Sequence, residues 1–444
     1  MQPTQRKTAL LIIFLTVFID LLGFGMVLPL LPIYGEQLAQ VDGYSSQQVG
    51  LIVGLLMSSF SATQFLFLPI WGRLSDRIGR RPVILIGLAG STFFYAMFGV
   101  ATFYRSLAGL FITRIGAGIA GATISTAQAF IADTTAKEHR ARGMAMIGAA
   151  FALGFTLGPL LGVVSLFAGG DISMSAAPGF AAAALSGAAF LLAVLRLPES
   201  LSRDSESAAR KVFDRAALRA AVSLPSIGLL LVASFVAVFS FANFESTLSL
   251  QIKNIVEADS GGEISSAPLR ALLRWIAARH YDDPKDAQLI VVFATFAYLG
   301  IILTLAQGFL VRRLSGRMSE GTMATMGAVT AILGFALLAW AARRADFTLL
   351  LEAMALEVVG FAFVNPSLQS LISRRSDPRL QGSILGLGQS MSSLARILGP
   401  MCGIWLLKQS QEWPYWAAAI CMLLGLAMIV PAVRGGKDFV DPAV

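Results

Sequence analysis

The sequence predicts an all-α membrane protein of twelve transmembrane helices, arranged in two pseudo-symmetric bundles of six. Three observations support this fold class. Apolar residues make up 56% of the 444 residues and charged residues only 14%, whereas soluble domains carry roughly 25% charged residues. The chain contains twelve apolar stretches of membrane-spanning length, and a basic motif between the second and third of them recurs in the second half.

Each predicted span has about 20 mostly apolar residues, as a helix needs to cross the hydrocarbon core. The first run shows no small-residue cleavage site, so we expect a membrane helix there and not a removed signal peptide. The spans are 8–33, 47–70, 82–103, 107–131, 143–168, 178–197, 226–250, 288–311, 321–342, 346–371, 382–407 and 413–433.

The two longest connections between spans predict the domain organisation. We expect a first bundle, a cytoplasmic linker and a second bundle with an outer-surface insertion. These parts cover residues 1–198, 199–223 and 224–444, with the insertion at 255–287.

The distribution of basic residues predicts the orientation. The formal net charge is +8, but most lysines and arginines lie in short loops that fall on one side of the membrane. Such a distribution marks the cytoplasmic side of a membrane protein. It places both termini in the cytoplasm and argues against nucleic acid as a partner.

Two internal matches indicate a duplication. The motif from Gly72 to Arg81 recurs in weaker form from Gly308 to Arg317, and Gly158-Pro159-Leu-Leu-Gly162 corresponds to Gly399-Pro400-Met-Cys-Gly403. Most duplicated membrane proteins that move solutes are secondary transporters.

These motifs resemble those of the major facilitator superfamily over essentially the whole chain, and most of all its drug:proton antiporters of the tetracycline-efflux type. Helix 1 is similar to the opening helix of tetracycline exporters from Asp20 to Pro32. The second sequence motif of this family, in the fourth predicted span, begins at Arg114. Ala145 and Val163 depart from the fullest antiporter signature, which has glycine there. The antiporter motif is carried by Gly154, Gly158, Pro159 and Gly162, and the loop motif by Gly72, Asp76, Arg77, Gly79, Arg80 and Arg81.

The resemblance implies a secondary active transporter that exchanges protons for small amphiphilic, drug-like compounds by alternating access. It further implies a monomer in contact with lipid in the bacterial inner membrane. Helices 7 and 11 look closer to a eukaryotic tetracycline-transporter-like branch associated with organic anion export. An organic-anion transporter or uniporter without proton coupling is therefore the alternative, and a nontransporting receptor or scaffold is a third reading.

An enzyme, a cofactor site and a metal site are not expected. The sequence has no Gly-x-Ser-x-Gly nucleophile turn, no Walker loop and no zinc-ligand spacing. Cys402 and Cys421 lie inside apolar segments, which argues against a disulfide framework. His139 and His280 fall in loops, so no intramembrane histidine can join a proton relay.

Ionisable residues within the spans are the candidate functional groups, because a charge at the centre of a membrane helix costs at least about 2.5–3.5 kcal/mol. Asp20 is the first candidate for the coupled proton, since protonation would remove a buried charge; alternatively, it caps a break near Gly23 or pairs permanently with Arg114. Glu245 occupies the analogous place in helix 7. It is expected to be a second proton site, a group that attracts a cationic substrate or the fixed partner of a basic side chain. Glu352 is expected near the interface.

The remaining charges and several polar residues are expected around the same cavity. Arg114 is expected to hold a carboxylate rather than to contact substrate. Arg396 is expected to pair with Glu357, or to bind an anionic substrate when that pair opens. The candidate wall residues are Gln128, Asn243, Phe244, Asn365 and Gln389.

The loop motif is expected to act as a cytoplasmic gate. Gly72 and Gly79 would allow a tight turn and close helix approach. Asp76 would meet the positive N-terminal end of helix 11, and the family resemblance suggests that Arg77 reaches Asp133. Arg80 and Arg81 are expected only to enforce topology and to bind lipid phosphate. The second copy has Arg312 where Asp76 stands, so the gate would be asymmetric.

Overall fold

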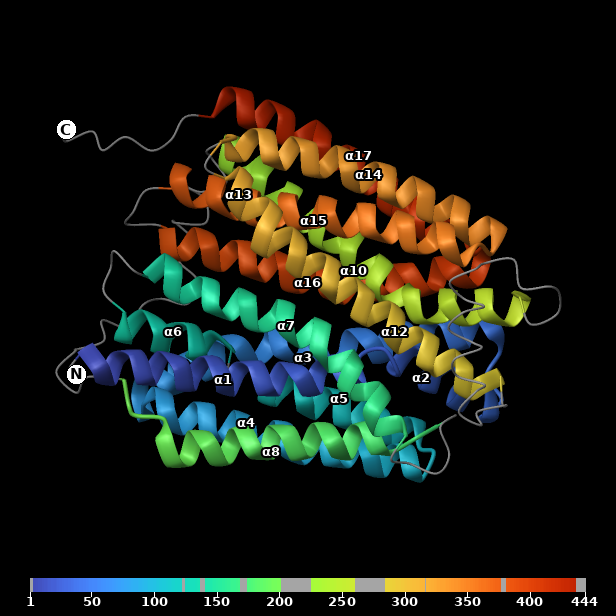
Figure 1. The fold of residues 1–444 in the computed structure, drawn as a ribbon, viewed down its shortest axis with the longest axis horizontal. Helices are drawn as coiled ribbons and strands as arrows, with labels where there is room; N and C mark the ends of the chain where they lie inside the picture. The colour runs from blue at the N-terminus through green and yellow to red at the C-terminus, as the bar shows by residue number, and fades with distance from the viewer. Residues whose placement is uncertain are drawn as a thin grey trace. The chain divides into compact units, whose positions relative to one another are not determined.

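The computed structural model describes residues 3–121, 124–135, 140–167, 174–200, 225–259, 284–315, 317–376 and 381–436. These residues form helices and turns and contain no strand (Figure 1). The helices of the first half are α1 (Pro3–Val27), α2 (Leu31–Val41), α3 (Ser46–Ile78), α4 (Arg80–Phe103), α5 (Leu107–Gly121), α6 (Ile124–Thr134), α7 (Arg140–Leu166) and α8 (Ala177–Arg196).

The second half is also built of long helices. Its elements are α10 (Pro225–Asp259), α12 (Pro284–Leu305), the π-helix η2 (Ala306–Val311), α13 (Arg312–Leu314), α14 (Glu320–Arg344), α15 (Phe347–Arg375), α16 (Gln381–Gln409) and α17 (Trp413–Gly435).

Packing divides the chain into two compact units. The first unit contains Met1–Arg210 and Arg279–Ile301, and the second contains Lys211–Ala278 and Ile302–Val444. Most of α12 therefore groups with the first unit, although its sequence position lies in the second half. Most of the expected linker and insertion falls in 201–224 and 260–283, outside the described residues.

Eleven helices among the described residues are long and apolar enough to cross a membrane. The fifth predicted span corresponds to α7, in which the apolar segment Ala152–Leu166 is shorter than these.

Several predicted boundaries differ from the structure, and those of the first two spans lie at sequence motifs. The first span was expected to continue through Ile33, but α1 ends at Val27 and a turn precedes α2. Pro29 and Pro32 explain the interruption, because proline lacks the backbone N–H that a helix interior needs. The second span was expected to end near residue 70, but α3 continues to Ile78. The loop motif is therefore mostly helical.

Candidate functional site

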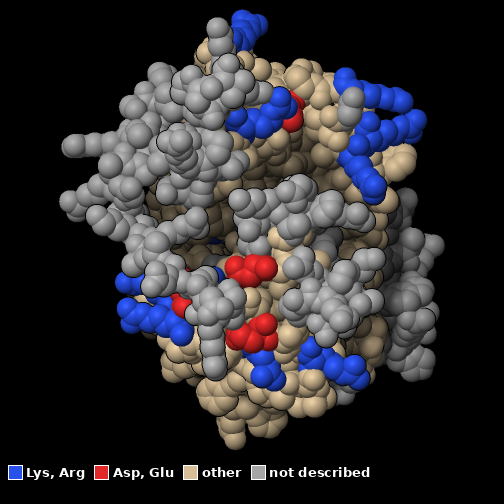
Figure 2. All heavy atoms as spheres, turned by 90° about the vertical axis from the view of Figure 1, so that its left-hand side faces the viewer, with Lys and Arg blue, Asp and Glu red and all other residues tan. Residues whose placement is uncertain are grey.

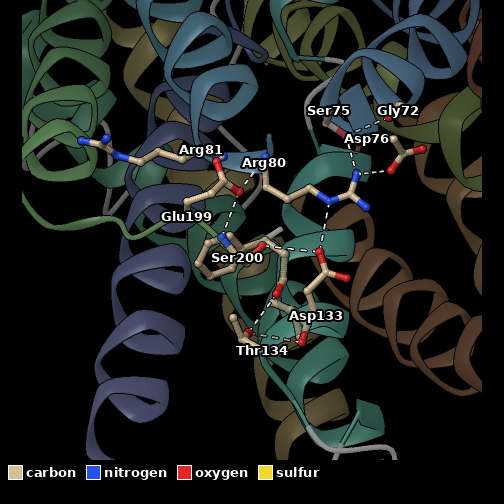
Figure 3. A network of polar contacts seen from close by, with 11 residues as sticks. Gly72, Ser75, Asp76, Arg80, Arg81, Asp133, Thr134, Glu199 and Ser200 are labelled. Carbon is tan, nitrogen blue, oxygen red and sulfur yellow. Dashed lines mark hydrogen bonds and ion pairs between the residues drawn. The ribbon is translucent and has the colours of Figure 1, made fainter. Parts of the chain in front are cut away.

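Gly79 makes the turn between α3 and α4, and the carboxylate of Glu199 lies at the start of α4, where Figure 3 shows it beside Arg80. Gly79 has a φ of 106°, a conformation that favours glycine over residues with a side chain. Glu199, which follows α8, accepts hydrogen bonds from the backbone N–H groups of Arg80 at 2.9 Å and Arg81 at 3.1 Å. Glu199 thereby caps the N-terminus of α4, where a negative charge is favourable.

Arg80 ties three helices of the first unit together. Its Nε donates to Oδ2 of Asp133 in α6 at 3.1 Å. Its Nη1 lies 2.6 Å from Oδ1 of Asp76 in α3 and donates to Oγ of Ser75 at 2.6 Å. The Arg80 side chain is only 11% exposed, against 43% for Asp76 and 30% for Asp133. Charge-assisted hydrogen bonds of this kind are stronger than neutral ones.

This arrangement corrects several expectations for the motif. Arg80, and not Arg77, reaches Asp133, because Gly79 ends α3 and leaves Arg77 exposed while Arg80 starts the next helix facing inward. Arg81 is also more than a topology signal, since its Nη2 donates to the carbonyl oxygen of Val194 in α8 at 2.7 Å.

Gly72 differs from expectation as well. It lies inside α3, and no atom stands within 4 Å of where a Cβ would be, so it makes neither a turn nor a close approach. The expected contact between Asp76 and the N-terminal end of α16 stays a prediction.

Exposed basic side chains gather at the helix ends around this turn. Figure 2 shows the left-hand side of Figure 1, with lysine and arginine side chains at several places on it. Arg73 and Arg77 near the end of α3 and Arg196 at the end of α8 are exposed. This distribution is the one used above to predict the cytoplasmic side, and the orientation itself stays a prediction.

Asp20 lies inside the first bundle. Ser186 of α8 donates a hydrogen bond to its Oδ1 at 2.8 Å, and Ser91 of α4 is a second hydrogen-bonding neighbour. Asp20 borders a small cavity of about 30 Å³, whose other lining residues are Thr16, Val17, Leu21, Ile84, Leu88 and Ala127. A cavity of that size has room for a water molecule. Its wall is mostly apolar, and Asp20 and Thr16 are the polar residues on it.

The antiporter-motif glycines position the helix that carries Asp20. A Cβ added to Gly158 of α7 would lie 2.8 Å from Cα of Gly25 in α1, and one added to Gly154 would lie 2.8 Å from Cβ of Leu21. Such distances require glycine, so α1 and α7 pack backbone to backbone. A Cβ on Gly162 would overlap the ring of Phe293 in α12, and Pro159 lies within α7 one residue after Gly158.

Arg114 is buried among aromatic rings and not against a carboxylate. It is 3% exposed, and its Cζ lies 4.5 Å from the ring centroid of Phe60 and 5.9 Å from that of Phe24. The structure records no ion pair between Arg114 and Asp20, both of which it describes. Tyr95 of α4 is close enough to interact electrostatically with both. Cation–π contacts therefore hold the guanidinium in place.

Three charged side chains lie together in the second unit. Glu357 is 1% exposed and Glu245 is 8% exposed. Arg396 interacts electrostatically with Glu245, and Glu245 with Glu357. The expected ion pair between Arg396 and Glu357 is absent from the structure, although both residues are described. Glu352 is exposed.

The candidate wall residues separate into two groups. Gln128 and Gln389 are exposed, and Asn365 is half-buried and accepts a hydrogen bond from Gln369 at 3.5 Å. Asn243 and Phe244, in contrast, are fully buried in helix packing and line no open surface in this structure.

The packing around these two residues explains their burial. Asn243 donates to the carbonyl oxygen of Pro414 at 3.3 Å and packs against Gly403, while the Phe244 ring centroid lies 6.4 Å from that of Phe335.

The second copy of the loop motif forms a different structure. Gly308 lies in the π-helix η2, and Arg312 and Arg313 are exposed in the short helix α13 that follows. The ion pair near this end of the second unit joins Arg374 of α15 to Glu320 of α14, with both carboxylate oxygens 2.9 Å from Nη1. The duplicated sequence has therefore not kept the Arg80 network.

Several residues of these sites were not found from the sequence. Ser186, Ser91 and Tyr95 are small or aromatic residues in apolar helices, and only the packing of distant helices brings them to Asp20. Glu199 carried a local signal, because it follows directly on Pro198 where the sixth span ends.

Comparison with known sequences identifies the family. The chain matches the Major Facilitator Superfamily over residues 13–400 and 271–442. The class C tetracycline resistance protein of Escherichia coli is 31% identical over 402 residues, which cover 89% of each chain. Major facilitator superfamily domain-containing protein 10 of Mus musculus is 28% identical over 443 residues, covering 90% of this chain and 87% of that protein.

Solved structures agree with this assignment. The human organic anion transporter MFSD10 (TETRAN) has a TM-score of 0.66 and 25% identity, covering 97% of this chain and 100% of that one. The D-xylose–proton symporter has a TM-score of 0.67 at 15% identity, which concerns the fold alone, and covers 95% of this chain and 96% of that one. These likenesses confirm the all-α transporter fold and show a multi-pass membrane transporter, not an enzyme. The chain belongs to the major facilitator superfamily.

Proposed function

We propose that the protein is a proton-coupled antiporter that exports small amphiphilic compounds from a bacterial cell by alternating access. Its relatives named as tetracycline resistance proteins support drug export. The two bundles, 1–198 and 224–444, rock about a central substrate path, with both termini in the cytoplasm. The observation that carries the proposal is the carboxyl group of Asp20, which hydrogen-bonds to Ser186 in a membrane-spanning helix without an arginine or lysine partner among the described residues.

Asp20 provides the coupling chemistry. A carboxylate in a membrane-spanning helix is costly, and proton binding removes that cost. Ser186 and Ser91 hold the group in place, while the adjacent cavity admits the water that delivers the proton. Proton binding and release at Asp20 then change the relative free energies of the inward-open and outward-open states, which is what an antiporter requires.

The close packing of α1 on α7 couples this change to movement. Because Gly25 and Gly158 are in backbone contact, α1 and α7 move as one body. The Arg80 network keeps α3, α4 and α6 together at the other end of the bundle. Asp76, still 43% exposed, is free to contact the second bundle when the cytoplasmic side closes.

The test is pH-driven transport in proteoliposomes with Asp20→Asn. The isosteric amide keeps the size of the side chain but cannot take up a proton at physiological pH, so transport driven by a pH gradient should be lost. Exchange of labelled for unlabelled substrate without a gradient should persist. Ser186→Ala is the matched control: it removes the neighbour and keeps the carboxyl group, so coupling should survive. Undiminished pH-driven transport by Asp20→Asn contradicts the proposal.

Organic-anion transport without proton coupling is the second candidate, and Arg114 favours it. A buried guanidinium held by Phe60 and Phe24, with no ion pair among the described residues, can receive the carboxylate of an aromatic substrate. The similarity to a protein described as an organic anion transporter agrees with this reading. Under it, aromatic carboxylates should inhibit transport more strongly than aromatic amines of the same size, and Arg114→Gln should abolish that preference while Arg114→Lys keeps part of it.

A further inference from the structure

An aromatic stack fixes the alignment of α10 and α15 in the second unit. The rings of Phe241 and Phe361 lie 4.1 Å apart between centroids, at an interplanar angle of 17°. The two helices run antiparallel (Figure 1). The stack therefore marks one level at which these two helix faces meet.

The same two faces carry a carboxyl group each, one turn beyond the stack. Glu245 follows Phe241 by four residues, and Glu357 precedes Phe361 by four. Residues four apart lie on the same helix face, about 6 Å along the axis. Because the helices are antiparallel, the step from Phe241 to Glu245 and the step from Phe361 back to Glu357 lead in the same direction. The two carboxyl groups therefore meet about one helical turn from the aromatic stack. Their electrostatic interaction agrees with this placement.

The packing leaves these groups little contact with solvent. Oε2 of Glu357 and Oε1 of Glu245 are buried and have no hydrogen-bond partner among the described residues. A Cβ added to Gly334 of α14 would lie 2.5 Å from the backbone nitrogen of Glu357, so α14 closes one side directly. A buried carboxylate oxygen without a donor is unfavourable.

The surrounding helices supply one compensating charge. Arg396 of α16 acts on Glu245. No other acidic or basic residue occurs in the middle of a helix packed on α10 or α15: α14 has none between Glu320 and Arg343, and α17 has none before Arg434. On α15 itself, Glu352 is exposed. Two acids thus share one base, and an uncompensated buried charge costs several kcal/mol.

We propose that Glu245 and Glu357 form a carboxyl pair that binds a single proton, with Arg396 neutralising the acid that stays ionised. Two adjacent carboxyl groups cannot both ionise cheaply, so the proton belongs to the pair. The pair is a second proton-binding site, in the half of the chain that lacks Asp20. Its part in transport rests on the proton coupling proposed above, whereas proton binding itself does not.

Infrared difference spectroscopy of the purified full-length protein without substrate tests the pair, and every sample carries Asp20→Asn so that the Asp20 carboxyl group contributes no signal. At neutral pH this Asp20→Asn parent should show the carbonyl-stretch band of a neutral carboxylic acid, and alkaline buffer should abolish it. Glu357→Gln should remove this band, because Glu245 is then ionised opposite Arg396. Glu245→Gln removes the neighbouring negative charge and leaves Glu357 buried, so the band should remain at neutral pH but disappear at a lower pH than in the parent. Glu352→Gln, an exposed acid of the same helix, should leave it unchanged.

The outcomes separate this inference from the proposed function. Asp20→Asn should lose pH-driven transport and still show the band, so each proposal has its own readout. A band that persists in a folded Glu357→Gln protein overturns the pair, as does an Asp20→Asn parent without the band or a band whose pH dependence Glu245→Gln leaves unchanged. Elution as a single species on gel filtration establishes that a variant is folded, and the two single variants provide independent tests if one of them aggregates.

Discussion

Replacing Arg80 by methionine tests the network at the α3–α4 turn. The change keeps an unbranched side chain but removes the bonds to Asp133, Asp76 and Ser75. The Asp76 contact is an exposed pair four residues apart on the chain and contributes only about 0.5 kcal/mol. The Asp133 and Ser75 contacts are more buried, and charged hydrogen bonds of that kind contribute about 1.5–3 kcal/mol. We expect a loss of about 2–3 kcal/mol after allowance for solvent screening.

The assay is thermal unfolding of the purified protein in detergent. For a unit of roughly 200 residues, 1 kcal/mol corresponds to about 2–4 °C, so Arg80→Met should lower the midpoint by about 4–12 °C. Arg77→Met is the matched control. Arg77 is exposed and its side chain has no ion pair in the described structure, so its replacement should change stability by less than about 0.5 kcal/mol.

The comparison of the two variants decides which arginine the motif uses. Equal destabilisation by Arg77→Met and Arg80→Met would refute the assignment of Arg80 to Asp133. The double variant Arg80→Met with Asp133→Asn gives a second check. If the pair is direct, the second change should cost less in the absence of Arg80 than in its presence.

Three further predictions concern packing, capping and charge. Gly158→Ala should destabilise the protein by about 1–3 kcal/mol, because its Cβ would lie 2.8 Å from Gly25 Cα. Gly72→Ala is the control: its Cβ would meet nothing within 4 Å, so it should stabilise α3 by about 0.5–1 kcal/mol. Thermal unfolding that ranks the two variants in reverse contradicts the packing described. Glu199→Ala should cost about 1 kcal/mol through loss of the α4 cap, with Glu257→Ala, an exposed acid near the end of α10, as the neutral control in the same assay. If organic-anion transport is the function, Arg114→Gln should weaken competition by an aromatic carboxylate at least tenfold in a transport assay and leave competition by an aromatic amine within twofold; equal changes for both would exclude charge recognition.

Much of the fold follows from the sequence, because span length and apolar content are local properties. The departures have local causes of a different kind. Pro29 and Pro32 end α1 early, and the motif at Gly72 continues as helix because nothing before Gly79 forces a turn. The conformation of Gly79 then decides which arginine faces inward, and residue spacing alone does not reveal it.

The charged residues could be identified from the sequence, but their partners could not. An acid inside a predicted span is conspicuous, which is why Asp20, Glu245 and Glu357 were found. Their neighbours depend on the rotation of helices about their axes, which turns a side chain by about 100° for each residue. Arg396 therefore faces Glu245 and not Glu357, and Arg114 meets Phe60 and not a carboxylate.

Proton release on substrate binding is the most direct measurement of the central claim. Purified protein in weakly buffered detergent solution is mixed with a saturating transported compound while a pH-sensitive dye reports protons. Competition between substrate and the proton at Asp20 predicts release of a proton by the wild type and by Ser186→Ala, and none by Asp20→Asn. Substrate binding without any proton release by the wild type, or unchanged release by Asp20→Asn, would contradict the account.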